Sequence, residues 1–229
     1  VSVRDTFSQE QLVRIGYKNP QLAPDSATVM SRYISVEELS KKSEESTLAM
    51  IKRFSQGYLV FQISQAHVRD KEQAFAEQLS HLFKETGLPI VFIAIGNAAG
   101  HNDTAGINKV VSFLDDDVVF DRYLTGNIFD LMNIIRNSSC YCGTSLHGLI
   151  TSMSFAVPRV GLLPKLRKQV NYMKTWDLEH MPRGVEPEQL AKSVNVAMAT
   201  PKEELIALGQ HLTDTYLASF NISSGLLTK

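Results

Sequence analysis

The sequence contains little of what marks a secreted, membrane-spanning or nucleic-acid-binding protein. It has only two cysteines, Cys140 and Cys142, and no apolar run that approaches the roughly 20 residues needed to cross a bilayer. Its 229 residues carry a net charge of -1 and no basic stripe, so we expect no nucleic-acid partner. With 44% hydrophobic and 21% charged residues, the composition is that of a globular protein.

The two cysteines are separated by one residue within an apolar run that has the pattern of a strand. Side chains two residues apart on a strand point to the same face, and such neighbours rarely form a disulfide. We therefore expect buried, reduced thiols and a cytoplasmic location, which includes a peripheral position at the inner face of the membrane. No further ligands lie at the spacing of a zinc site, so we expect metal-independent chemistry without a cofactor.

The chain begins with "VSVRD", which has no initiator Met and starts an alternating apolar strand at once. We expect the chain to be a fragment or an excised domain. The next residues predict a helix with Ser8 as its N-cap and Gly16 as its C-cap. Residues 35–56 are polar, charged and weakly helical. We interpret residues 1–56 as the remnant of an N-terminal domain followed by a surface connector.

From residue 57 onward, apolar strands alternate with amphipathic helices. The expected strands lie at 58–64, 89–96, 118–123, 140–145 and 158–163, and the expected helices at 70–87, 104–116, 126–138, 146–155 and from Pro164 onward. This alternation predicts βαβ units, and continuous apolar strands predict a parallel sheet covered on both faces. Residues 57–229 are therefore predicted to form an α/β domain with a doubly wound parallel sheet, Rossmann-like, closed by one or two helices within 187–220.

In such a sheet, ligands bind at the carboxyl ends of the strands, so the informative residues directly follow each strand. The best candidate is "GTSLHG" at 143–148, between a predicted strand and an apolar helix. Gly143 permits a sharp turn, and Thr144 or Ser145 can cap the helix, whose first amide groups and dipole then attract an anion. His147 would contact that anion or donate a proton to it, unless it only packs or bonds to backbone.

Other residues that follow strands supply weaker candidates. Asn97 and His101 could contact a sugar or nucleotide, unless they belong to a glycine-rich surface loop in which Asp103 or Thr104 caps the next helix. Lys165 could contribute charge to the same anion as the 143–148 turn, unless it is an ordinary surface lysine. His67 follows the first strand of the main domain, and we expect it to be solvated.

Four pieces of the sequence resemble, in order and spacing, the polysaccharide pyruvyl transferase family. They are "VSVRD" at the start, "PDSA" at 24–27, "GTSLHGLITSMSFAVPRVGL" from 143, and "PKL" at 164–166. The resemblance implies the C-terminal part of a two-domain fold like that of GT-B glycosyltransferases, with the active site between the domains. It also implies transfer of a pyruvyl group from phosphoenolpyruvate to a sugar of a cell-surface or exopolysaccharide, usually as a ketal that bridges two hydroxyls.

The same resemblance implies residue roles. The family's functional histidine falls on His147, its donor-binding arginine on Arg4, and a frequent lysine on Lys165. Arg4 could hold the donor carboxylate in a bidentate fork, while the helix start and Lys165 hold the phosphate. We predict His147 as the general acid or a phosphate-stabilising group.

Two departures from the family pattern matter. Many relatives have arginine where this chain has Ser145, so a donor contact is missing or supplied elsewhere. The chain also contains little of the family's N-terminal domain, whose glycine-rich strand–loop–helix forms half of the cleft, so the fragment alone is expected to be inactive or incomplete.

Two other functions fit parts of the sequence. A nucleotide-sugar glycosyltransferase of GT-B shape would bind a diphosphate at the same turn, but it usually needs a carboxylate in the following helix for the ribose hydroxyls. The stretch "LHGLITSMSF" has no acidic residue. A non-catalytic carbohydrate- or partner-binding module is favoured by Ser145 and the missing domain, and is opposed by the joint presence of Arg4, His147 and Lys165. The acceptor sugar and the oligomeric state cannot be read from the sequence.

Overall fold

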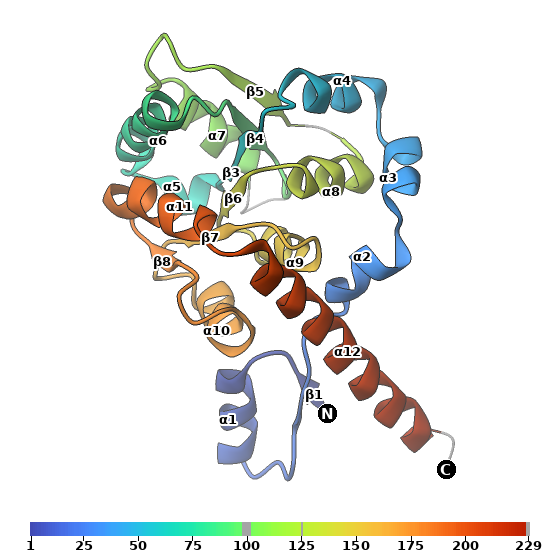
Figure 1. Ribbon diagram of the computed structural model, residues 1–229. Helices are drawn as coiled ribbons and strands as arrows, with labels where there is room; N and C mark the ends of the chain where they lie inside the picture. The colour runs from blue at the N-terminus through green and yellow to red at the C-terminus, as the bar shows by residue number, and fades with distance from the viewer. Residues whose placement is uncertain (98–101, 125, 228–229) are drawn as a thin grey trace.

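The computed structural model describes residues 1–97, 102–124 and 126–227, with side chains as far as Phe220. Its centre is a six-stranded parallel sheet in the order β5-β4-β3-β6-β7-β8 (Figure 1). The strands are β3 (Leu59–Gln62), β4 (Ile90–Ile93), β5 (Phe120–Tyr123), β6 (Cys140–Gly143), β7 (Arg159–Leu162) and β8 (Arg183–Val185). The predicted fold class, a doubly wound parallel sheet, is confirmed.

The strand order places a topological switch point between β3 and β6. From β3 the chain builds outward through β4 and β5, and from β6 it builds in the opposite direction through β7 and β8. The two central strands pair in parallel, from Leu59 beside Cys140 to Gln62 beside Gly143. Ligands of doubly wound sheets bind in the crevice outside the carboxyl ends of the strands at this point.

The strand predictions hold for five of the six strands, each of which is shorter than its predicted range. Continuous apolar residues mark β3, β4 and β6, whose side chains are buried on both faces of the sheet. Strand β8 was not predicted, because its three residues contain no apolar run. Its central residue, Gly184, also has a left-handed conformation (φ 68°).

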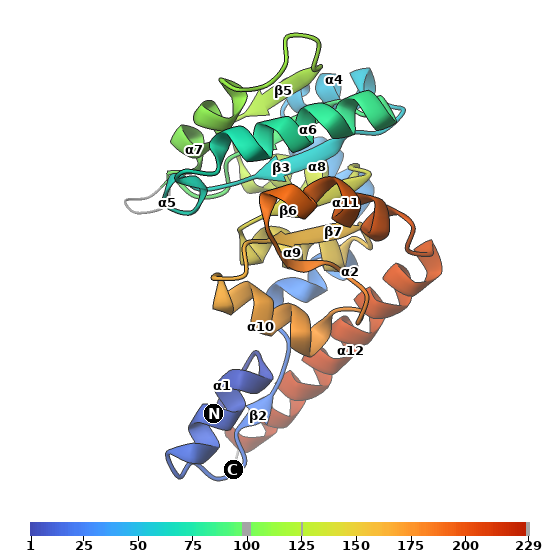
Figure 2. The ribbon, with the colours of Figure 1, turned by 90° about the vertical axis from the view of Figure 1, so that its left-hand side faces the viewer.

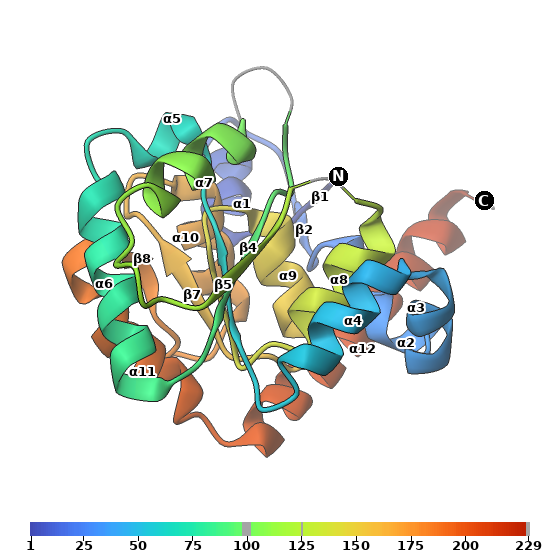
Figure 3. The same cartoon turned by 90° about the horizontal axis from the view of Figure 1, so that it is seen from above.

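Helices cover both faces of the sheet, as Figure 3 shows from above. One face carries α6 (Glu72–Thr86), α7 (Asp103–Val111) and α11 (Leu190–Met198), and the other carries α8 (Ile128–Arg136) and α9 (Leu146–Ser154). The packing is aromatic at the centre, where Phe61 on β3 contacts Phe75 on α6 and Phe92 on β4 with ring centroids 5.5 and 5.8 Å apart. Helix α6 ends at Gly87, whose φ of 70° explains why glycine stands there.

Residues 36–53 are more ordered than predicted. Instead of a weakly helical connector, they form α3 (Val36–Lys42) and α4 (Glu45–Arg53), which pack against α8. Ser35 and Glu38 make a reciprocal capping box at the start of α3. Met50 and Phe54 belong to the same buried cluster as the sheet. The domain boundary at 56/57 stays a prediction.

The first residues form a small lobe below the main sheet (Figure 2). Strands β1 (Ser2–Val3) and β2 (Gln21–Leu22) pair in parallel around α1 (Thr6–Arg14). The predicted N-cap Ser8 was wrong: the helix begins three residues earlier than predicted, and the N-cap is Asp5, whose side chain accepts from the Ser8 amide at 2.8 Å. The lobe contacts α10 (Arg167–Trp176), where the Trp176 indole donates to the Arg4 carbonyl at 2.8 Å.

The last helices close over the body, as predicted. Helix α11 packs on α6 and β7, and α12 (Lys202–Leu227) crosses the end of α9 and extends past the sheet (Figures 1 and 2). The hydroxyl groups of Thr213 and Ser154 both donate to the Thr28 carbonyl, at 3.1 and 2.9 Å, which ties α12 and α9 to the segment after β2.

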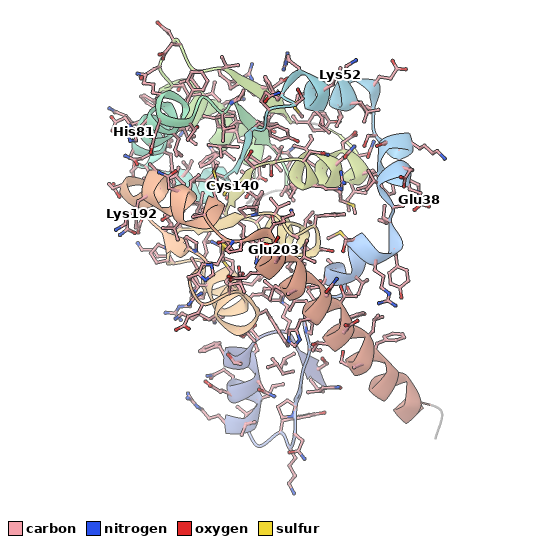
Figure 4. All side chains as sticks on the ribbon, viewed as in Figure 1. Glu38, Lys52, His81, Cys140, Lys192 and Glu203 are labelled. Carbon is pink, nitrogen blue, oxygen red and sulfur yellow. The ribbon has the colours of Figure 1, made fainter. Side chains whose placement is uncertain are left out.

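Both cysteines lie in the interior. Cys140 and Cys142 are buried, free thiols on β6, as predicted. Figure 4 labels Cys140. A hydrogen bond with the Cys140 side chain, together with burial, raises the pKa of the Cys142 thiol well above its ordinary value, so the thiol stays protonated. Within the described ranges no helix is both long and apolar enough to cross a membrane.

Candidate active site

A cavity of about 550 Å³ lies at the carboxyl ends of β4, β3, β6 and β7. It brings together side chains from segments that are far apart in the sequence. Among the predicted site residues, those that line it are Arg4, Thr144, Ser145, His147 and Lys165. The expectation that these residues converge is supported by their positions around one cavity, which spans the switch point between β3 and β6.

The turn between β6 and α9 has the predicted conformation. Ser145 is the N-cap of α9, and its hydroxyl accepts from the Gly148 amide at 3.3 Å. Gly143 and Gly148 both lie directly against the Tyr141 hydroxyl, so that a methyl group at either position would collide with it. These two glycines therefore allow the strand and the helix to approach closely enough to form the turn.

Gln62, at the end of β3, holds this turn in place and was not singled out from the sequence. Its side-chain oxygen accepts from the backbone amides of Thr144 and Ser145, at 2.9 and 2.8 Å. The Tyr141 hydroxyl, 3.4 Å away, donates to the same oxygen. Burial raises the pKa of Tyr141 well above its ordinary value, which keeps this hydroxyl protonated and able to donate.

The hydrogen bonds to Gln62 limit which backbone amides of the predicted anion site can bind a ligand. Because Gln62 already accepts from Ser145, the Ser145 amide is not available to a ligand. The next two amides, those of Leu146 and His147, have no acceptor among the residues that the structure describes. These two groups, with the positive end of the α9 dipole, form the part of the turn that can hold an anion.

The other side of Gln62 connects the turn to the loop after β4. The Gln62 amide nitrogen donates to Asp103 at 2.8 Å, and the same carboxylate oxygen accepts from the amides of Ile95 and Gly96, each at 2.9 Å. Asp103 is 2% exposed. Because three donors from different segments meet at one buried carboxylate oxygen, Asp103 fixes the turns after β3, β4 and β6 relative to one another. The N-cap of α7 is Asn102, not Asp103 or Thr104 as predicted from the sequence.

His147 lies where a functional histidine could act. It is exposed, in the first turn of α9, and lines the 550 Å³ cavity. Within residues 1–97, 102–124 and 126–227, no hydrogen bond to its imidazole is present. The ring also borders a second cavity of about 470 Å³, which is lined mainly by apolar side chains such as Met30, Ile128 and Leu131. His147 therefore stands between a polar and an apolar space and is not packed into the core.

Arg4 reaches the cavity from the N-terminal lobe and is held by Asp25. Its guanidinium donates to the Asp25 carboxylate at 3.1 Å, which uses one of its five N–H donors. The Asp25 amide in turn donates to the hydroxyl of the buried Tyr172 at 3.2 Å, and the Asp25 carboxylate caps the short helix that follows. Asp25 belongs to the "PDSA" piece, so this contact gives that piece a physical role as the support of Arg4.

Cations from the segment after β7 complete one wall. Lys165, Arg167 and Lys168 are exposed and line the cavity. Leu163, directly after β7, has a φ of 64°, an unfavourable conformation for a branched side chain, and its amide donates to the Val185 carbonyl at 2.8 Å. This sharp bend directs the chain toward the cavity, and Lys165 follows it by two residues.

The loop after β4 differs from its prediction. Asn97 does not line the cavity: its amide nitrogen donates to the Leu124 carbonyl at 3.3 Å, and its oxygen accepts from the Thr104 amide at 3.2 Å and from the Thr104 hydroxyl at 3.0 Å. Its polar atoms therefore hold the loop to α7 and to the end of β5. His101 lies outside the described residues.

The prediction that His67 is solvated was wrong. His67 is partly buried and lines the same cavity as His147. It belongs to the short helix α5 (Gln65–Val68), directly after β3. Its position after a strand that borders the switch point was visible in the sequence, but no adjacent turn glycine or helix cap drew attention to it.

The comparison with known families decides the assignment. A model of the family described as polysaccharide pyruvyl transferase matches residues 1–165, which include Arg4, the β6–α9 turn and Lys165. The chain belongs to the polysaccharide pyruvyl transferase family. Among curated proteins, none matches the sequence.

Solved structures with a similar fold are GT-B glycosyltransferases and epimerases. UDP-GlcNAc 2-epimerase from Methanocaldococcus jannaschii, solved with UDP-GlcNAc and UDP, gives a TM-score of 0.67 at 13% identity over 88% of this chain and 55% of that one. A glycosyltransferase from Rickettsia africae gives a TM-score of 0.66 at 13% identity over 99% of this chain and 63% of that one. The Anabaena protein HepE, solved with UDP and glucose, gives a TM-score of 0.60 at 14% identity over 100% of this chain and 63% of that one. At these identities the likeness establishes the fold alone.

This chain covers only part of each structure that it resembles. It spans between about half and two thirds of the length of these three proteins, at 55% to 63% of each. The described fold therefore corresponds to one Rossmann-like part of a GT-B architecture, together with the small lobe that carries Arg4.

Proposed function

We propose that the protein containing this chain transfers a pyruvyl group from phosphoenolpyruvate to a pair of hydroxyls on a cell-surface or exopolysaccharide sugar. The observation that carries the proposal is the convergence of Arg4, His147 and Lys165 on one cavity, from the lobe, the β6–α9 turn and the segment after β7. Membership in the polysaccharide pyruvyl transferase family supports the same reaction class.

The charges of the cavity suit a donor with two anionic ends. Phosphoenolpyruvate carries a carboxylate and a phosphate on neighbouring atoms of one small molecule. The free donors of the Arg4 guanidinium match the planar carboxylate, to which arginine binds in a bidentate fork. The amides of Leu146 and His147 and the ammonium of Lys165 match the phosphate. Arg167 and Lys168 add positive charge on the same side.

The reaction requires two proton movements. The donor's methylene carbon must gain a proton to become a methyl group, and each attacking sugar hydroxyl must lose one. The products are the ketal and hydrogen phosphate, so the two hydroxyl protons end on the methyl carbon and on the phosphate. We assign His147 to the donor, as the acid that protonates the methylene carbon or as the group that stabilises the phosphate, because an imidazole exchanges protons near neutral pH.

The two other functions make different predictions for the same cavity. A nucleotide-sugar transferase would bind a nucleoside diphosphate, as the UDP-bound structures of the epimerase and of HepE do. The described α9, Leu146–Ser154, contains no carboxylate that could hold ribose hydroxyls. A carbohydrate-binding module would bind a glycan without using His147.

The test measures phosphate release from phosphoenolpyruvate in the presence of candidate glycans, using the whole protein that contains this chain. We expect release by the wild type and a loss of about 10²- to 10⁴-fold in His147→Ala, the usual contribution of an acid–base residue. The matched control is His81→Ala, because His81 is an exposed residue of α6 (Figure 4) and does not line the cavity. Equal release by wild type and His147→Ala would contradict the mechanism, and turnover of a UDP-sugar instead of phosphoenolpyruvate would favour the glycosyltransferase.

A further inference from the structure

The cavity contains a second histidine that the proposed donor site does not use. His67, on α5 after β3, lines the cavity together with His147, which follows β6. Because β3 and β6 are neighbours in the sheet, the two turns lie side by side at the switch point. The two histidines therefore reach one space from adjacent strands.

His67 is held in a defined orientation. Its Nδ1 atom lies 2.6 Å from the hydroxyl oxygen of Ser64, a side chain that is only 2% exposed. The turn itself is anchored, since the Gln65 amide donates to the Asn102 carbonyl at 3.3 Å. Gly106 on α7 lies so close to this backbone that an added Cβ would be 2.7 Å from the Gln65 nitrogen. A fixed Nδ1 contact on a rigid turn orients the ring of His67 for proton transfer.

The charges around the cavity change along the sheet edge. At the β7 end stand Lys165, Arg167 and Lys168, and Arg4 lies at the same end because its lobe contacts α10. At the opposite end, beyond β3, stands the carboxylate of Asp103, the one acidic side chain among the described residues that line the cavity. The anionic donor therefore belongs over β6 and β7, which leaves the space over β3 and β4 for the neutral sugar.

We propose that the acceptor sugar occupies the β3–β4 side of the cavity, with His67 as the catalytic base for its attacking hydroxyl. This inference depends on the proposed function. The sugar's position places the hydroxyl beside His67, while His147 remains beside the donor. The contact between Nδ1 and Ser64 fixes the orientation of the His67 ring at this side of the cavity.

The proton steps then balance. His67 takes the proton of the first hydroxyl as its oxygen bonds to the central carbon of phosphoenolpyruvate, and the electrons of the double bond take a proton from His147 to form the methyl group. The second hydroxyl then bonds to the same carbon as the bond to phosphate breaks, and its proton restores His147. The proton held by His67 leaves through solvent with the phosphate, as hydrogen phosphate. Both histidines return to their starting states.

The experiment compares variants of the whole protein in steady-state turnover and in phosphoenolpyruvate binding without acceptor. For His67→Gln we expect kcat to fall about 100-fold or more, while the Kd for phosphoenolpyruvate changes less than about threefold. Ser64→Ala, which removes the Nδ1 contact, should lower kcat about tenfold. The control His81→Gln, on the exposed face of α6, should match the wild type.

Chemical rescue separates a catalytic base from a structural residue. In His67→Ala, added imidazole should restore part of kcat, because a small base can enter the space that the side chain leaves, whereas a packing defect does not respond to it. Thermal unfolding of each variant checks that it folds. If His67→Gln does not fold, the kcat of Ser64→Ala tests the inference instead.

Three results would contradict the inference. In the first, the kcat of His67→Gln stays within about threefold of that of an active wild type, a result that leaves the proposed function intact. In the second, His67→Gln weakens phosphoenolpyruvate binding about tenfold or more, which moves His67 to the donor side. In the third, the wild type releases no phosphate with any glycan, and then the proposed function fails and the assignment of His67 fails with it.

Discussion

The turn after β6 and the loop after β4 contain similar polar residues, but among the predicted residues that the structure describes, His147 of the turn lines the cavity and Asn97 of the loop does not. At the β6–α9 turn, His147 follows the N-cap by two residues, so the ring emerges beside the free amides at the helix start. At the β4–α7 loop, Asn97 bonds to Thr104 and to the Leu124 carbonyl and does not reach the cavity. The carboxylate of Asp103, at the start of α7, is buried and accepts from Gln62 and from the amides of Ile95 and Gly96.

The difference shows which polar residues a sequence reading can assign. A histidine within the first turn of a helix has its direction fixed by the helix geometry, so its position after a strand predicts where it points. An asparagine in a longer loop can satisfy backbone groups nearby, and asparagine does this readily. Whether an asparagine bonds to nearby backbone groups or faces a cavity depends on the fold of the loop, which the spacing of residues in the sequence does not determine.

The largest effect should come from the residue that joins the two regions. Gln62→Leu removes the acceptor of two amides in the β6–α9 turn and the donor to buried Asp103. We expect a loss of about 2–4 kcal/mol in the free energy of unfolding, since several buried polar groups lose their partner, and a loss of turnover. Denaturant unfolding measures the change in the free energy of unfolding. The control Gln65→Leu changes an exposed side chain three residues further on, and similar stability losses in both variants would show that Gln62 is not the link.

Arg4→Lys tests the donor end of the cavity. Lysine keeps the charge and the ion pair with Asp25, but it loses the planar fork that binds a carboxylate at two points. We expect the KM for phosphoenolpyruvate to rise about 10- to 100-fold, a loss of one to two charge-assisted hydrogen bonds. Steady-state kinetics with Arg14→Lys, at the end of α1, gives the matched control. An unchanged KM would remove Arg4 from the donor site.

Asp25→Asn tests whether the "PDSA" piece acts through Arg4. Asparagine can still cap the short helix after residue 25, but it no longer pairs its charge with the guanidinium. We expect a rise of about three- to tenfold in the KM for phosphoenolpyruvate, because a partly exposed ion pair positions Arg4 without binding the donor itself. The exposed Asp116→Asn should have no effect. If Asp25→Asn lowers kcat with KM unchanged, the residue does not work by positioning Arg4.

Asn97→Ala should have the smallest effect and gives the sharpest contrast with His147. It loses its hydrogen bonds to Thr104 and Leu124, so we expect about 1 kcal/mol less stability. Turnover should stay within about twofold of the wild type, because Asn97 does not line the cavity. A tenfold loss of turnover, measured in the same assay, would place Asn97 in the site and contradict the contrast between the two regions.

The sequence predicted the features that depend on local pattern. The buried strands are continuous apolar runs, α6 ends at a left-handed glycine, and the β6–α9 turn combines a glycine with a capping serine. Each of these is determined within about ten residues of chain. For the same reason Arg4 was identified only by resemblance to a family, because nothing local distinguishes an arginine that reaches a distant cavity from one that faces solvent.

The features that were missed depend on tertiary contacts. Gln62 has no unusual neighbours in sequence, and its function appears only when β3 pairs with β6 and brings the Ser145 amide to it. His67 was expected to be solvated, and only the packing of α7 against its turn makes it line the cavity. Strand β8 is short and contains glycine, so that it becomes a strand only by adding to the edge of β7.

The central claim is that the start of α9 binds the anionic donor with His147 beside it. The most direct measurement is a crystal structure of the protein with phosphoenolpyruvate. We expect the phosphate to accept hydrogen bonds from the amides of Leu146 and His147 and to lie beside Lys165, with the carboxylate against Arg4. Phosphoenolpyruvate bound elsewhere, with the His147 ring turned into the apolar cavity beside Met30 and Ile128, would contradict the claim.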